Sequence, residues 1–135
     1  MDEKSGPYDA RYLAGIKYFN VCDFFEAHEV WEDLWTNIEG PTRTFYQGLI
    51  QVAVCLHHFG NGNIRGARKL YHSSCRYLEA YLPRHEGLDV EKLIRELTIC
   101  CQEFIDSEEE YPQAEIVVEK IPEIHLENAK PGETP

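Results

Sequence analysis

A histidine and several carboxylates are grouped in residues 24–35, FFEAHEVWEDLW. His28 and Glu32 are four residues apart, so their side chains meet on one face if this segment is a helix. An imidazole and a carboxylate at that spacing can hold a divalent metal ion, or form an acid–base couple in which Glu32 orients His28. With a metal on His28 and Glu32, Glu29 would be the general base of a hydrolase-like reaction. These residues are the first candidate site.

The same residues also have a purely structural interpretation, in which His28 lies at the edge of the core and bonds to Glu32. The spacing resembles the HExxH helix of metalloproteases, but Glu32 stands where the second histidine would be. The ExxH order of di-iron bundles is missing because Phe25 occupies the place of the glutamate. Three interpretations therefore stay open: structural histidine, metal site and metal-free acid–base pair. The cofactor is unassigned, with a divalent metal as the candidate.

A second polar stripe lies further along the chain. Gln47, Gln51 and His58 are spaced by four and seven residues, which places them on one side of a helix. If this helix forms a hairpin with the preceding one, the stripe could face His28 and Glu32. The candidate ligand-binding residues are then Gln47, Gln51, His58 and Trp35. The alternative is a polar network that fixes the register of the two helices.

The sequence has one cationic cluster, in residues 65–76. Arg65, Lys69, His72 and Arg76 are spaced by four, three and four residues, and Arg68 flanks them. Such a row could bind a phosphate or carboxylate ligand. In a chain this acidic, we prefer the alternative that it pairs with acidic residues of the helices 24–37 or 89–107.

Apolar residues recur at helical spacing in five segments, residues 8–20, 24–37, 42–60, 64–82 and 89–107. The expected N-caps of the last four are Asp23, Thr42, Asn63 and Asp89, and Glu26 would complete a capping box with Asp23. We expect an all-α fold, a compact bundle of about five helices with an irregular C-terminal tail. Residues 1–7 would be a flexible leader, residues 8–110 the helical domain, and residues 111–135 an extended or partly disordered tail.

Charge and cysteine content restrict the function further. The formal net charge of −11 argues against nucleic acid and against an anionic membrane surface as partners. The five cysteines are odd in number and form no CxxC pair, which fits reduced thiols in a cytoplasmic protein. We therefore expect a small polar ligand or a protein partner. A homo-oligomer is a further expectation, in which two chains would meet through a Trp31/Trp35 face.

Three motifs in order resemble one known family. They are FN at residues 19–20 followed by FFEAHEVWEDLW, then YQGLIQVA at 46–53, and GNIRGA at 62–67. Together they resemble a small prokaryotic family catalogued as domain of unknown function number 309, over about residues 18–105. The resemblance implies an all-α fold and no settled activity. It marks as positions of interest Glu26, His28, Glu29, Glu32, Trp35, Gln47 and Gln51. Cys22 and Trp31 depart from it, since a glycine and an aliphatic residue are expected there.

The leading functional hypothesis is a small binding or interaction module, with a buried network of His28, carboxylates and glutamines between the helices 24–37 and 42–60. One alternative is a metal-dependent, hydrolase-like enzyme that uses His28, Glu29 and Glu32. The other is a structural homodimer module.

Overall fold

The structure is a computed structural model that describes residues 8–127. Its helices are α1 (Ala10–Asn20), α2 (Phe24–Thr36), α3 (Arg43–Gly60), α4 (Ile64–Leu78), α5 (Val90–Cys100) and α6 (Gln102–Ile105). Two 3₁₀ turns, η1 (Glu79–Tyr81) and η2 (Val118–Lys120), and a hairpin of β1 (Arg84–His85) and β2 (Leu88–Asp89) complete it. The predicted all-α bundle is confirmed. In the part of the chain that is described, no helix combines the length and the apolar character needed to cross a membrane.

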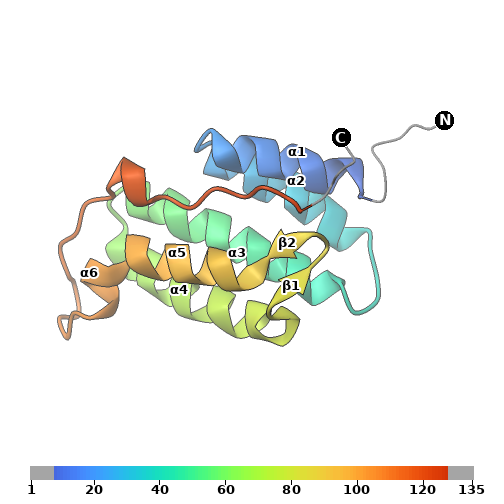
Figure 1. Ribbon diagram of the computed structural model, residues 1–135. Coiled ribbons are helices and arrows are strands. Elements are labelled where there is room, and N and C mark those ends of the chain that lie inside the picture. Colours follow the sequence, from blue (N-terminus) through green and yellow to red (C-terminus); the bar gives the residue numbers. More distant parts are fainter. Residues whose placement is uncertain (1–7, 128–135) are drawn as a thin grey trace.

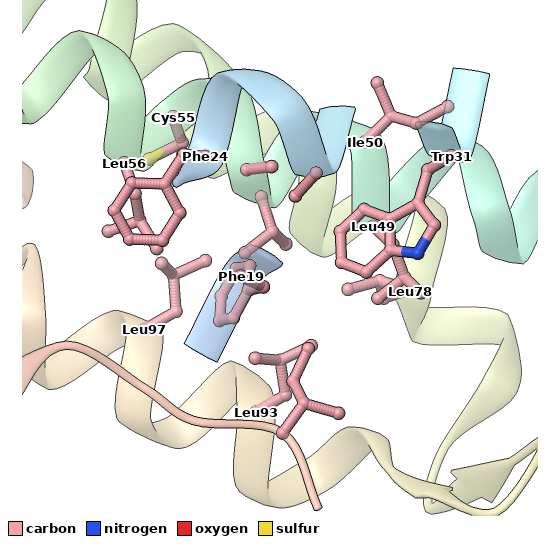
Figure 2. Packing of buried hydrophobic residues seen from close by; sticks show 14 of the residues in the cluster. Phe19, Phe24, Trp31, Leu49, Ile50, Cys55, Leu56, Leu78, Leu93 and Leu97 are labelled. Carbon is pink, nitrogen blue, oxygen red and sulfur yellow. The ribbon is translucent and has the colours of Figure 1, made fainter. Parts of the chain in front are cut away.

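Helix α3 is the centre of the molecule, with α2 on one side and α4 on the other (Figure 1). Helix α1 packs on α2, and α5 lies beside α4 (Figure 1). The short loops between α1, α2, α3 and α4 make each pair an antiparallel hairpin. The core between them is apolar and aromatic (Figure 2); its largest fully buried side chains include Trp31, Tyr12, Phe19, Phe45, Phe104 and Leu49.

Two of the four predicted N-caps form. Asn63 accepts a hydrogen bond from the Gly66 amide at 3.1 Å, and Asp89 accepts one from the Lys92 amide at 2.9 Å. The other two, Asp23 and Thr42, occupy the N-cap positions of α2 and α3 as predicted, but their side chains make no capping bond. The Thr42 hydroxyl instead bonds to His85 Nε2 at 3.1 Å, which ties the start of α3 to the hairpin.

The predicted helices 64–82 and 89–107 are each divided. Helix α4 is followed by η1 and by the hairpin, in which Arg84 of β1 lies opposite Asp89 of β2. Helix α5 ends at Cys100, and the chain bends at Cys101 before α6. Since Cys101 and Phe104 are both fully buried, the bend keeps this last turn against the core.

From η2 to residue 127, the chain runs along the bundle between α1 and α5 (Figure 1). The Asn20 side chain exchanges two hydrogen bonds with the backbone of Ile124, both 2.8 Å long. The Glu127 amide also donates to the Gly87 carbonyl at 2.7 Å. These contacts hold the C-terminal segment to the helices as far as residue 127. The predicted leader 1–7 and the end of the predicted tail, residues 128–135, lie outside the described residues.

Candidate functional site

His28 is a half-buried residue of α2. Its Nδ1 is 3.0 Å from the carbonyl oxygen of Phe25. A carbonyl can only accept, so the Nδ1–H donates and the Nε2 of a neutral ring keeps its lone pair. This bond takes the place of the expected bond to Glu32, because the carbonyl three residues earlier in the helix is already within reach.

Phe25 joins α2 to the C-terminal half of α3. Its ring centroid is 5.3 Å from that of His28 and 5.7 Å from that of His57. Aromatic pairs at these separations stabilise the packing of the two helices. Phe25 is nevertheless 47% exposed, so this small aromatic cluster also reaches the surface.

The two glutamines of α3 face α4. Gln47 Nε2 donates to the Tyr77 hydroxyl at 3.3 Å, and the Ser73 hydroxyl donates to Gln51 Oε1. The predicted network that joins both glutamines to His28 is therefore corrected: their hydrogen bonds go to the other neighbouring helix. Sequence reasoning missed Ser73 and Tyr77, although a serine and a tyrosine four residues apart on one helix side were a usable signal.

Close approach of α4 explains this choice. A Cβ on Gly48 would lie 2.7 Å from Leu78 Cδ2, so the absence of a side chain at Gly48 lets the two helices pack tightly there. At this separation the glutamine amides reach the hydroxyls of α4. Each amide still has atoms outside these bonds: the Gln47 oxygen and the Gln51 nitrogen.

His58 is half-buried at the end of the same stripe. Because Asn63 Oδ1 accepts from the Gly66 amide, its Nδ2 is the atom that faces His58 Nδ1, 3.3 Å away, and donates to it. Burial lowers the pKa of His58, and His57 lowers it further. The neutral ring with a proton on Nε2 is thus the form that fits the structure.

The two tryptophans of α2 have different surroundings. Trp31 is fully buried, and its Nε1–H donates to the Tyr12 carbonyl of α1 at 3.2 Å. A dimer through a Trp31/Trp35 face is therefore excluded, because Trp31 points into the molecule. Trp35 is half-buried beneath the Arg43 guanidinium, whose carbon lies 4.0 Å from the ring centroid. Its Nε1–H is buried and has no acceptor among the described residues.

The predicted basic row of α4 is partly engaged. Arg65 pairs with Glu110 at 3.7 Å, and Arg68 donates to the carbonyls of Ser107, Glu109 and Glu110. These bonds hold the acidic segment that follows α6. Lys69 and Arg76 are exposed, and neither forms an ion pair with residues 8–127.

Exposed and half-buried side chains of three neighbouring helices form one surface, which includes several of the predicted site residues, although these do not form one network. We call this surface the three-helix face. Helix α2 contributes an acidic row, Glu29 and Glu32. Helix α3 contributes a half-buried stripe, Gln47, Gln51, Val54 and His58. Helix α4 contributes a basic row, Lys69 and Arg76. Glu29 and Glu32 are exposed and unpaired within residues 8–127. The stripe lies between rows of opposite charge.

A catalytic metal would need more ligands than this face brings together. Within residues 8–127, no group of three or more His, Cys, Asp and Glu side chains could hold a metal ion. Among these residues, His28 Nε2 and the carboxylate of Glu32 thus gain no third protein ligand, which a zinc hydrolase requires.

Comparison with known proteins finds similarities for part of the chain. Residues 12–70 match the family described as "Domain of unknown function (DUF309)". The chain is 35% identical over 75 residues to the "Uncharacterized protein YpuF" of Bacillus subtilis (strain 168), an alignment that covers 54% of this chain and 43% of the relative. It is 37% identical over 57 residues to an "Uncharacterized protein" of Aquifex aeolicus (strain VF5), covering 41% of this chain and 17% of that protein. The chain therefore spans less than half the length of either relative.

Proposed function

We propose that this chain, whose residues 12–70 belong to the DUF309 family, is a cytoplasmic protein-interaction module that binds its partner on the three-helix face. It is a small helical module of a family without an assigned activity. The family match includes all of α2 and α3 and the first half of α4, the helices that form the face.

The arrangement of Gln47 and Gln51 is the observation that carries the proposal. Both amides are fixed from one side by Tyr77 and Ser73, so they lose little freedom when a partner binds. Their remaining donor and acceptor atoms lie between the acidic and basic rows. A partner can therefore satisfy them while it meets both rows, which favours one orientation.

The shape and composition of the face favour a protein over a small molecule. Small ligands bind in concave sites that cover most of their surface, whereas this face extends over three helices and carries exposed charges at both edges. Both relatives are longer than the part they share with this chain, as expected for a module joined to different sequences.

The cysteines support a reducing compartment. All five are free in the structure, and Cys55, Cys100 and Cys101 are buried in the core. Burial raises the pKa of Cys75, so this thiol resists forming the reactive thiolate.

Site-specific photo-crosslinking in cells of the source organism tests the proposal. A benzophenone amino acid at Glu32 or Lys69 should crosslink to one defined protein, whereas the same group at Glu91 or Arg95 of α5 should not. The binding is then rebuilt from the two purified proteins. The variant Gln47→Ala with Gln51→Ala should weaken it at least about tenfold, as loss of hydrogen-bonded interface residues typically does.

Three results would refute the proposal. One is crosslinking from α5 but not from the three-helix face. Another is no crosslink from either surface. The last is a complex of purified proteins that binds the glutamine variant as tightly as the wild type.

A further inference from the structure

We infer that the partner of the three-helix face is a second copy of this chain, which binds face to face as a two-fold dimer. This inference rests on the proposed function and names the partner of the same surface. It starts from the order of charges across the face: the acidic row of α2, the neutral stripe of α3 and the basic row of α4.

An interface between identical copies must be complementary to itself. Glu29 and Glu32 lie on one side of the α3 stripe, and Lys69 and Arg76 lie on the other. A surface with negative charges on one side and positive charges on the other is complementary to itself when a second copy is turned over onto it. None of these four residues is engaged in an ion pair with another of the residues 8–127.

The charges also select the symmetry axis. A two-fold axis in the contact plane and parallel to α3 places the acidic row of each copy over the basic row of the other. An axis in that plane but perpendicular to α3 would place acid over acid and base over base, which costs several kcal/mol. The expected dimer therefore has its two α3 helices parallel and facing each other.

The middle of the face fits the same axis. Each glutamine of one copy then faces its own equivalent in the other copy. A primary amide presents a donor beside an acceptor, so two amides related by a two-fold axis can exchange two hydrogen bonds. The Gln51 nitrogen is outside the bond from Ser73, and the Gln51 oxygen has a second lone pair for this exchange.

The net charge of the chain makes other dimers unfavourable. Two copies that each carry a formal charge of −11 repel one another when they approach at random. Lys69 and Arg76 place two cations on a largely acidic molecule at the side of the face opposite the acids. Their position offsets the repulsion in one relative orientation only.

A charge exchange between two variants tests the inference. The first variant, Glu29→Lys with Glu32→Lys, makes both rows basic, and the second, Lys69→Glu with Arg76→Glu, makes both rows acidic. Light scattering across a concentration series up to millimolar should give a dimer mass for the wild type and a monomer mass for each variant alone. An equimolar mixture of the two should recover the dimer mass, because both contacts between acidic and basic rows are then restored.

Matched exchanges on other surfaces serve as the control. Glu91→Lys with Glu103→Lys, and separately Lys17→Glu with Arg95→Glu, change exposed residues outside the face by the same charge and should stay dimeric. Circular dichroism melting establishes that every variant is folded.

The outcomes separate this inference from the proposed function. A wild-type monomer at every concentration, or a dimer that survives the two face variants, overturns the inference. So does a mixture that remains monomeric. If the face crosslinks to a different protein, the proposed function stands and the second copy is ruled out. If the face crosslinks to nothing, the proposed function fails as well.

Discussion

The indole of Trp31 lies directly against the backbone of Gly15, where α1 crosses α2. A Cβ on Gly15 would overlap the Nε1, Cδ1 and Cε2 atoms of Trp31. Gly15 thus makes room for a tryptophan at a position where the family resemblance predicts an aliphatic residue. The two residues determine how closely α1 can approach α2.

Gly15→Ala should therefore destabilise the protein by about 2–3 kcal/mol, the usual cost of overpacking a core. Trp31→Leu alone should also destabilise it, because it leaves a cavity. In the double variant the added methyl group occupies part of the vacated space, so a coupling energy of about 1–2 kcal/mol should appear in a double-mutant cycle by urea unfolding. Gly60→Ala, with no atom within 4 Å of the added Cβ, is the control and should be nearly neutral. If the changes in unfolding free energy from Gly15→Ala and Trp31→Leu are strictly additive, the close contact between Gly15 and Trp31 is contradicted.

Cys22 adopts a left-handed conformation, with φ of 65°, in the turn between α1 and α2. That region costs roughly 1–2 kcal/mol for residues with a side chain, whereas glycine enters it freely. The resemblance led us to expect a glycine at this position, and the backbone supplies the reason. Cys22→Gly should raise the free energy of unfolding by about 0.5–1 kcal/mol. Cys22→Ala is the control for loss of the exposed thiol, and an equal stability of the two variants would argue against backbone strain.

The bonds between Asn20 and Ile124 hold the C-terminal segment to α1. Asn20→Ala removes the hydrogen-bond partners of both the amide and the carbonyl of Ile124, a residue that is nearly buried. Each backbone group left unpaired should cost about 1–3 kcal/mol. The segment should then detach before the helices unfold, which frees the backbone around the exposed Lys120 to enter the active site of trypsin. Cleavage after Lys120 should be faster in Asn20→Ala than in the wild type. It should be unchanged in the control Asn37→Ala, whose side chain bonds only within α2 and its cap. Equal cleavage rates in all three proteins would show that other contacts hold the segment.

Local signals in the sequence predicted the helices well. Asn63 and Asp89 were identified as caps because a cap and the amide that it binds lie within three residues. The hairpin was missed because each strand has only two residues, too few for an alternating pattern. Its turn, Glu86-Gly87, has positive φ at both positions, as a two-residue hairpin turn requires, but it offers only the glycine as a signal.

The site was harder to predict than the fold. Helical spacing grouped Gln47 with Gln51 correctly, because the hydrogen bonds of both side chains go to the same neighbouring helix. Helical spacing could not show which neighbouring helix a group of side chains would contact. The two glutamines bond to Ser73 and Tyr77 of α4. The contact between Asn20 and Ile124 could not be predicted either, since the two residues are 104 positions apart.

The pairing of His58 with Asn63 predicts a dependence of stability on pH. Burial lowers the pKa of His58 in the folded protein, and His57 adds to this effect. The unfolded chain therefore takes up a proton first, near the ordinary histidine pKa of about 6.5. The contribution of His58 is fully present above that value and is lost as the pH falls through it toward the folded pKa. Protonation of Nδ1 would also remove the acceptor for Asn63, which caps α4.

Urea unfolding at about pH 8 and about pH 5.5 checks this prediction, since these values bracket the ordinary histidine pKa. The wild type should lose more stability between the two than His58→Gln, whose amide does not titrate. His72→Gln, a change at an exposed ring of α4, is the matched control and should follow the wild type. If His58→Gln and the wild type lose the same amount, His58 titrates alike in both states and the described environment of its ring is wrong.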